Sequence, residues 1–275
     1  MSFSVNTNAS AFIALQNLSA TTRQLEVSQN RINTGLAVAT AKDNSAVFAI
    51  AQNLRAEVGG LRAVTQSIER GVSVLDVARN AGETISDLLI QLKEKAVAGS
   101  DEGLDSASRS ALAEDFNALR DQIDIIVNNA SFNGSNLIDG GATDLKVLLS
   151  SDGTQSFQVD NVSLGLGGSN IAITAGQTFA TATEAGALVT TIDTALKNVN
   201  SAVGTIGSAQ RTLETQKTFV AKLSDTIEVG IGNLVDADLA RESAKLQALQ
   251  VKQQLGLQAL SIANQSPQSI LALFQ

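Results

Sequence analysis

Residues 185–227 read AGALVTTIDTALKNVNSAVGTIGSAQRTLETQKTFVAKLSDTI, and apolar side chains return along them in alternating steps of three and four residues. Such a repeat keeps one apolar stripe on one side of an α-helix. The stripe consists of Ala185, Leu188, Ile192, Ala195, Val199, Ala202, Ile206, Ala209, Leu213, Gln216, Val220, Leu223 and Ile227. The segment predicts one helix on the order of 60 Å long at ~1.5 Å per residue. Gly230 and Gly232 are expected to end it.

The same spacing recurs in the first half of the chain and predicts three more helices. Near the amino terminus the stripe is Ala11, Leu15, Leu18, Thr22, Leu25, Gln29 and Ile32. A second, longer stripe is Leu54, Val58, Leu61, Thr65, Ile68, Val72, Leu75, Ala78, Gly82, Ile85, Leu89, Leu92 and Ala96. A third is Leu112, Phe116, Leu119, Ile123 and Ile126. Asp105 or Ser106 is expected to cap the amino end of that third helix.

The last predicted helix, which runs to about Asn264, is apolar on two opposite faces. At ~100° per residue, one face carries Leu239, Leu246, Leu249, Leu257 and Leu260. The opposite face carries Ala240, Ala244, Ala248, Val251, Leu255 and Ile262. A helix in a monomeric bundle needs one apolar stripe, so this helix is expected to lie between a helix of its own chain and a neighbouring molecule.

The middle of the chain, residues 131–180, is rich in turns and carries short β-prone runs. Three turn dipeptides, Asn133-Gly134, Asp139-Gly140 and Asp152-Gly153, predict one or two β-hairpins there. The expected fold class is mainly α, a long antiparallel coiled-coil or helical-bundle rod with the hairpins at its outer end. The expected domains are a terminal coiled coil of residues 1–42 and 233–275, a helical bundle of residues 43–130 and 181–232, and the turn-rich segment 131–180.

Both ends of the chain lack charge, since no charged side chain precedes Arg23 or follows Lys252. An apolar end that finds no partner within its own chain predicts a contact between copies, and a contact that does not close on itself produces filaments. The residues expected at this assembly interface are Leu15, Leu18, Leu25, Ile32, Leu239, Leu246, Leu249, Val251, Leu255, Leu257, Leu260 and Ile262.

Composition argues against an enzyme. The chain has no His and no Cys, so it has no imidazole base, thiol nucleophile or Cys/His zinc site. Asp236 and Asp238 point about 200° apart on a helix and do not converge on a metal. Residues 101–160 hold eleven acidic and three basic side chains, which argues against nucleic acid or an anionic membrane as partner. We expect no cofactor, no membrane-spanning segment and no cleaved signal peptide.

Four stretches together resemble bacterial flagellin. They are INTGLAVATAKDNSAVFAIAQNLR at 32–55, GLRAVTQSIERGVSVLDVARNAGETISDLL at 60–89, NNASFNGSNLIDG at 128–140 and the carboxyl-terminal stretch GNLVDADLARESAKLQALQVKQQLGLQALSIANQSPQSILALFQ at 232–275. The resemblance covers about residues 1–150 and 180–275, and several separate motifs occur in the family's order.

The resemblance implies a secreted structural subunit that self-assembles into the extracellular flagellar filament for motility. In the family, the paired termini line the inside of the tube and the helical bundle forms its wall. The implied partners are other flagellin copies, the filament cap and hook-junction proteins, an export chaperone and the flagellar type III export apparatus. The short middle implies that large outer domains are absent.

One departure concerns recognition by the vertebrate innate receptor for flagellin. Receptor-activating members resemble LQRVRELAVQ where this chain has IQLKEKAVA, so Gln91 replaces an Arg and Lys95 replaces a Leu, while Glu94 is kept. We therefore expect weak or no activation.

Two alternatives stand beside a filament subunit. A hook–filament junction protein of the same superfamily shares the terminal helices, although the ending IANQSPQSILALF disfavours it. A secreted coiled-coil adhesin or effector would predict that the termini are dispensable for self-association.

Overall fold

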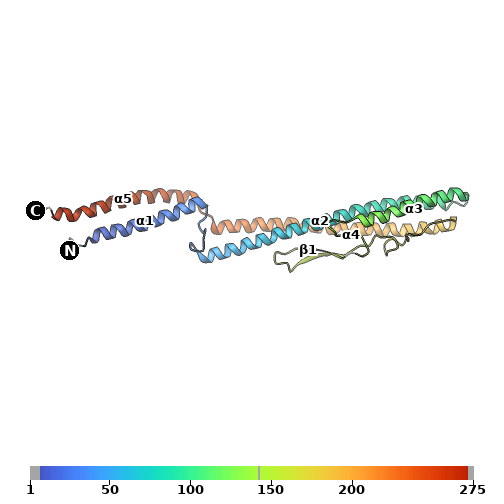
Figure 1. The fold of residues 1–275 in the computed structure, drawn as a ribbon, viewed down its shortest axis with the longest axis horizontal. Coiled ribbons are helices and arrows are strands. Elements are labelled where there is room, and N and C mark those ends of the chain that lie inside the picture. The colour runs from blue at the N-terminus through green and yellow to red at the C-terminus, as the bar shows by residue number, and fades with distance from the viewer. Residues whose placement is uncertain (1–6, 142, 272–275) are drawn as a thin grey trace. The chain divides into compact units, whose positions relative to one another are not determined.

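The computed structural model describes residues 7–141 and 143–271 and is mainly helical (Figure 1). Its elements are α1 (Ala9–Thr34), α2 (Ser45–Gly99), α3 (Ser106–Asn129), β1 (Leu145–Leu148), β2 (Ser156–Val159), α4 (Ala182–Val235) and α5 (Leu239–Leu271). The predicted mainly α class is confirmed, with one small hairpin in the described residues. The chain forms two compact units. Unit 1 combines the described residues up to Ala56 with those from Thr226 onward, and unit 2 is Glu57–Asp225.

In unit 2, α2 and α4 pack antiparallel in a constant register. Lys217 pairs with Glu69 at 2.8 Å, and Lys93 pairs with Asp193 at 2.6 Å. Between these ion pairs, 24 residues forward along α2 match 24 residues backward along α4. An unbroken register of this kind follows from heptad spacing on both helices, because each turn presents its apolar residues to the same partner.

The apolar stripe predicted on α4 is the one that is buried. Its members up to Leu213 are buried throughout, and Gln216 lies half-buried as the polar member. The expectation that α4 ends at Gly230 is wrong, since the helix continues to Val235. Glycine costs only about 0.5–1 kcal/mol in a helix, and the buried side chains of Ile231 and Val235 hold this turn in place.

Helix α3 turns back along α2 after a short loop. Asp105 caps it, as predicted, by accepting hydrogen bonds from the backbone N–H groups of Ala107 and Ser108. Arg109 then donates to the carbonyls of Gly99 and Asp101, which satisfies the end of α2 and the loop. The acidic loop is therefore held by one guanidinium group from the first turn of α3.

The hairpin pairs β1 with β2 antiparallel, with Leu145 opposite Val159 and Leu148 opposite Ser156. Gly153 of the predicted Asp-Gly turn has φ +73°, in the left-handed region that glycine enters at little cost. The hairpin lies along the side of α2 instead of capping its end, because glycines open a channel there.

The channel is formed by Gly60 and Gly71, spaced eleven residues apart and hence on one face of α2. A Cβ added at Gly60 would lie 2.7 Å from the Cβ of Ser151, and one added at Gly71 would lie 2.5 Å from Cγ2 of Val147. Leu148 N also donates to Oγ of Ser67 at 3.1 Å. The missing side chains thus let the hairpin backbone approach the helix.

In unit 1, the connector between α1 and α2 pairs with the connector between α4 and α5. Ala37 N donates to the carbonyl of Val235 at 2.7 Å, and Ala237 N donates to the carbonyl of Gly35 at 2.8 Å. Gly35 ends α1 with φ +72°. These backbone bonds bring the carboxyl end of α1 beside the amino end of α5.

The glycine channel predicts an asymmetry between two substitutions on α2. Gly71→Ala should destabilise unit 2 by about 1–3 kcal/mol, because the new methyl group overlaps Val147. Gly59→Ala is the matched control, since nothing lies within 4 Å of a Cβ there, and it should be neutral or stabilising by up to about 1 kcal/mol. Urea unfolding followed by circular dichroism measures both; equal effects would mean that the hairpin does not occupy the channel.

Candidate assembly surface

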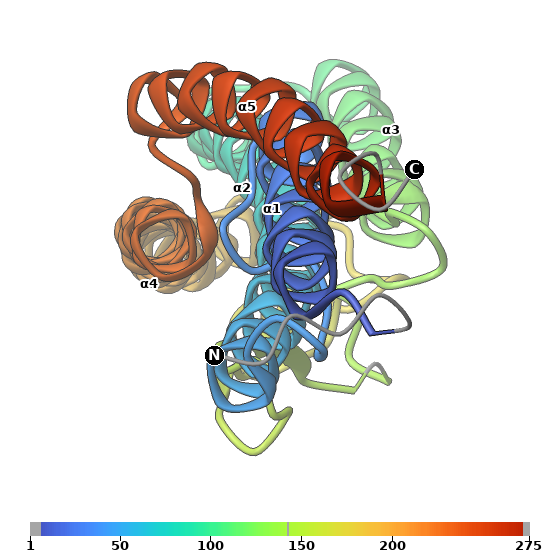
Figure 2. The same ribbon diagram turned by 90° about the vertical axis from the view of Figure 1, so that its left-hand side faces the viewer.

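Helices α1 and α5 of unit 1 pack antiparallel along their length (Figures 1 and 2). At one end of the pair the Asn8 side chain bonds to the carbonyl of Ala263, and at the other end Ser28 bonds to Glu242. Between them Gly256 lies against Leu18, whose Cδ1 would be 3.3 Å from an added Cβ. This close approach in the middle lets the two backbones stay near each other.

The predicted interface residues fall into two groups. Leu25 and Leu249 are buried between the helices, and Leu18, Ile32, Leu246 and Leu260 are half-buried. The exposed group is Leu15, Leu239, Val251, Leu255, Leu257 and Ile262. Leu239 and Leu257 therefore do not share the inward face with Leu246 and Leu249, although the helical wheel placed them together.

The stripe on α1 is also shifted at two positions. Leu15 is 50% exposed, while Ala14 beside it is half-buried. Gln29 is exposed, while Ser28 is fully buried. Either member of each neighbouring pair fits the three-and-four spacing, so the spacing alone does not decide which one faces α5. In the structure the smaller side chain of each pair, Ala14 or Ser28, is the more buried one.

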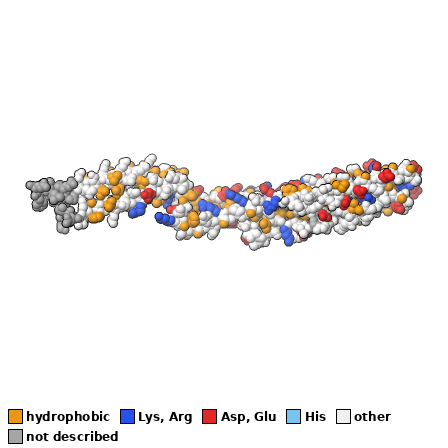
Figure 3. All heavy atoms as spheres, viewed as in Figure 1, with side chains coloured by type: hydrophobic (Ala, Val, Ile, Leu, Met, Phe, Trp, Pro, Cys, Tyr) orange, Lys and Arg blue, Asp and Glu red, His pale blue; other side chains and the backbone are white. Residues whose placement is uncertain are grey.

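Large apolar side chains remain exposed on both helices of the pair. Phe12 and Ile13 of α1 are 63% and 60% exposed, and Val251, Leu255 and Ile262 of α5 are 55%, 57% and 69% exposed. Figure 3 shows apolar side chains with few charges between them on the visible face of this region. We call these five residues the outer apolar set. A soluble monomer rarely leaves so many large apolar side chains uncovered on one helix pair.

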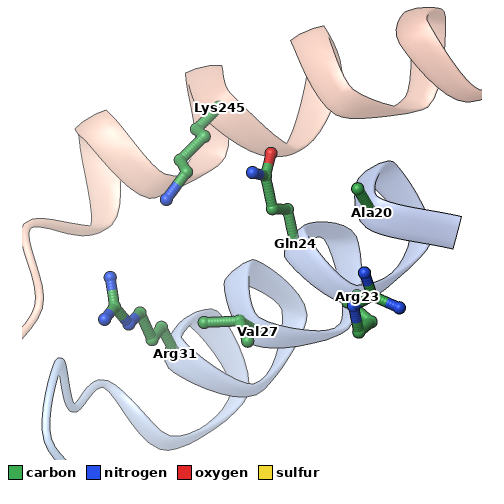
Figure 4. Close-up of a pocket in the computed structure, with 6 residues that line it drawn as sticks. All are labelled: Ala20, Arg23, Gln24, Val27, Arg31 and Lys245. Carbon is green, nitrogen blue, oxygen red and sulfur yellow. The ribbon is translucent and has the colours of Figure 1, made fainter. Parts of the chain in front are cut away.

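A buried carboxylate links α1 to α5, and the sequence analysis missed it. Glu242 is 7% exposed; it accepts hydrogen bonds from Oγ of Ser28 at 2.6 Å and from Nη1 of Arg31 at 2.9 Å. The Lys245 ammonium lies 3.8 Å from the same carboxylate, on the helix opposite Arg31 (Figure 4). The Ser28 hydroxyl, followed by Arg31, holds the pKa of Glu242 below its ordinary value against the effect of burial. The sequence did offer an indication of this contact. Glu242 is an acidic residue seven positions before Leu249 and therefore lies on the same inward stripe of α5.

A second missed contact joins the two chain ends. The side-chain oxygen of Asn8 accepts from Ala11 N at 3.0 Å and so caps α1. Its amide nitrogen donates to the carbonyl of Ala263 at 2.7 Å. That carbonyl lies four residues before Pro267, which has no N–H to offer it. Asn8 thus supplies the donor that the proline removes, and α5 runs on to Leu271, beyond the expected end near Asn264.

The altered receptor segment lies on α2 in unit 2. Gln91 and Glu94 are exposed, and Lys95 forms an ion pair with Asp115 of α3 at 2.7 Å. The Asp115 carboxylate raises the pKa of Lys95. The structure therefore brings Lys95 to α3 and leaves Gln91 and Glu94 facing solvent.

No metal-binding cluster occurs among residues 7–141 and 143–271. The Asp and Glu side chains of these residues include no group of three that could hold a metal ion. Of the helices in the same range, none combines the length and apolarity that crossing a bilayer requires.

Comparison with protein families gives two matches. Residues 5–143 match the bacterial flagellin N-terminal helical region, and residues 189–274 match the bacterial flagellin C-terminal helical region. Among curated proteins, flagellins FljM and FljK of Caulobacter vibrioides are each 52% identical to this chain over 272 residues, covering 99% of it and 98% of each relative. A flagellin of Brucella melitensis is 36% identical over 281 residues, covering 99% of both chains.

A solved structure shares the fold. A Vibrio parahaemolyticus protein assigned as flagellar hook-associated aligns with a TM-score of 0.59 at 17% identity, covering 70% of this chain and all of that one. At this identity the likeness concerns the fold alone.

The buried carboxylate predicts a pH dependence of the α1–α5 pair. Because the folded pKa is lowered, Glu242 stabilises the pair above the ordinary pKa of glutamate, and this contribution disappears as the pH falls through the folded pKa. Glu242→Gln should lower the free energy of unfolding by about 1–3 kcal/mol at neutral pH. Because glutamine does not titrate, this position should cause no further loss in the variant as the pH falls.

The measurement is thermal unfolding by circular dichroism from pH 7 to roughly pH 3. The difference between the native chain and Glu242→Gln should shrink as the pH falls. Glu26→Gln is the control, since Glu26 is an exposed acid on α1, the other helix of the pair; a pH-independent difference for Glu242→Gln would contradict the assignment.

Proposed function

Because this chain belongs to the bacterial flagellin family, it is a filament subunit of the motility organelle, and we propose that it assembles through the outer apolar set of its α1–α5 pair. The family is structural and non-enzymatic, and its members are components of the extracellular flagellar filament. The proposal concerns which residues make the contact.

The exposure of the outer apolar set is the observation that carries the proposal. Leu249 and its neighbours already occupy the inward face of α5, so Val251, Leu255 and Ile262 are not needed to hold α1. Burying such a side chain is worth about 1.5–3 kcal/mol. Burial of five such side chains per copy therefore favours the stacking of subunits.

Contacts between copies fit these residues better than contacts within one copy. The outer apolar set of one copy would meet a different surface on the next copy, so the contact does not close on itself and continues into a filament. The absence of charge before Arg23 and after Lys252 suits this burial, since each unpaired charge trapped there would cost several kcal/mol.

The other partners follow from family membership. We assign the filament cap and hook-junction proteins as contacts at the growing and basal ends. The flagellar type III export apparatus and an export chaperone would act before assembly. A chain without cysteine suits export in an unfolded state, because no disulfide can form and block passage.

The domain roles are also part of the proposal. Residues 1–42 and 233–275 would form the inner core of the filament, residues 43–130 and 181–232 its wall, and residues 131–180 its outer segment. The division into two compact units supports separate roles for the terminal pair and for the bundle.

Weak recognition by the vertebrate innate receptor is expected from the altered segment. Gln91 supplies no cation, and Lys95 is engaged by Asp115. Reporter cells should respond at least about tenfold more weakly than to an activating flagellin, the loss of about 1.4 kcal/mol of binding. Gln91→Arg combined with Lys95→Leu should raise the response, and full potency of the native chain would contradict the proposal.

Leu255→Asp tests the assembly contact. It places a charge in the outer apolar set and should abolish filaments in electron micrographs, while the helix content of the free subunit stays unchanged. Leu255→Met is the matched control, because it keeps an apolar side chain of similar volume and should assemble.

Leu249→Asp provides the contrast. Leu249 is 3% exposed and faces α1, so this change should reduce both helix content and assembly. Loss of helix content in Leu255→Asp to the same extent would assign Leu255 to the inside of the subunit and refute the proposal.

A further inference from the structure

A tight turn in unit 2 follows the end of α3. Asn133 and Gly134 are its two central residues, with φ +50° and φ +79°. The flanking residues close it, since Phe132 N donates to the carbonyl of Ser135 at 2.9 Å and Ser135 N donates to the carbonyl of Phe132 at 3.0 Å. Positive φ at both central positions is typical of the two-residue turns that Asn-Gly favours. We call residues 132–135 the Asn-Gly turn.

The two central residues of the Asn-Gly turn are free to react with each other. Among the described residues, the carboxamide of Asn133 and the backbone N–H of Gly134 have no hydrogen-bond partner. Both residues are exposed, and nothing lies within 4 Å of a Cβ added at Gly134. The Asn133 side chain can therefore rotate toward the next backbone nitrogen without breaking a bond, and the space around that nitrogen is open.

Glycine is the residue that opposes such an attack least. It has no Cβ, so its nitrogen approaches the preceding side chain without a steric clash, and it takes backbone conformations that other residues avoid. Asn133 is the only asparagine of the chain that precedes a glycine, and every other asparagine is followed by a residue with a side chain. Sequence and local structure thus single out the same position.

We propose that Asn133 is a site of spontaneous deamidation in the folded subunit. The backbone nitrogen of Gly134 attacks Cγ of Asn133. The new N–Cγ bond closes a cyclic imide, the Cγ–Nδ2 bond breaks, and ammonia leaves with the proton of the Gly134 N–H. Water then opens the imide, giving aspartate if the N–Cγ bond breaks and isoaspartate if the original peptide bond breaks. The reaction concerns a single subunit and does not depend on the proposed assembly contact.

Two other asparagines show how hydrogen bonds protect against this reaction. In the same loop, Nδ2 of Asn136 donates to the carbonyl of Val127 at 2.7 Å, and its Oδ1 accepts from Ile138 N at 3.0 Å. Oδ1 of Asn44 accepts from Val47 N at 3.2 Å. Each side chain must give up these bonds before its Cγ can meet the next backbone nitrogen. Both sites should therefore react more slowly than the Asn-Gly turn.

The two products differ in their effect on the turn. Aspartate leaves the backbone unchanged, and Asp-Gly suits the same kind of turn. Isoaspartate directs the backbone through Cβ and so lengthens it by one atom, which the reciprocal bonds between Phe132 and Ser135 cannot both accommodate. Leu137 and Ile138 beyond the turn are buried, so the change stays local. Either product adds one negative charge to a chain whose formal net charge is −8.

Peptide mapping of the full-length subunit tests the proposal. The protein is incubated in mildly alkaline buffer, and tryptic digests taken at intervals are analysed by tandem mass spectrometry, which locates each amide that has become a carboxylate. Asn133 should convert at least about tenfold faster than Asn136 or Asn44, a barrier lower by about 1.4 kcal/mol. Chromatography should separate aspartyl and isoaspartyl forms of its peptide. The rate should rise with pH, because the attacking nitrogen must lose its proton.

Gly134→Ala and Gly141→Ala are the matched variants. The first adds a methyl group beside the attacking nitrogen and should slow conversion of Asn133 at least about tenfold. The second changes an exposed glycine of the same tryptic peptide, with nothing within 4 Å of an added Cβ, and should leave the rate unchanged. Circular dichroism checks that both variants keep their helix content.

Incubation of the native chain in urea separates the effect of the fold from that of the sequence. The rate at Asn133 in the folded subunit should stay within about tenfold of its rate in the unfolded chain, whereas Asn136 and Asn44 should react faster once unfolded. The proposal is overturned if folding slows Asn133 by more than this, if Asn133 converts no faster than Asn136, if no isoaspartyl peptide forms, or if both glycine variants slow the reaction equally.

Discussion

The pairing of helices from opposite ends of the chain is the constraint on which the rest of the structure depends. α1 finds its partner in α5, and α2 finds its partner in α4, so unit 1 combines segments from both ends of the chain, while unit 2 is the continuous segment Glu57–Asp225. Contacts between residues more than 200 apart, such as Ser28 with Glu242, close the terminal pair. Folding of unit 1 therefore needs both ends of the chain.

The two faces of α5 differ in the size and polarity of their side chains. The inward face is small and partly polar, with Gly256 in close contact with α1 and Glu242 satisfied by α1 donors. The outward face keeps large apolar side chains such as Leu255 and Ile262. Polar groups that demand one geometry fix the register inside the subunit, while the exposed apolar groups lie on the face that we propose meets neighbouring copies.

The helices could be predicted because their spacing is local information. The α4 stripe from Ala185 to Val220 needed only the three-and-four repeat. The choice between Ala14 and Leu15 could not be made from spacing, since both fit and only the distance to α5 decides. Glu242 and the hairpin position depend on partners far away in sequence. The eleven-residue glycine spacing on α2 was visible, but its meaning required Val147 and Ser151 to be placed against it.

The double use of Asn8 has a consequence for incomplete chains. One amide group both starts α1 and satisfies the carbonyl that Pro267 leaves free. A product truncated before residue 263 loses that second bond, while the side-chain oxygen of Asn8 can still cap α1. In such a product, the bond that joins the start of α1 to the last turns of α5 is missing.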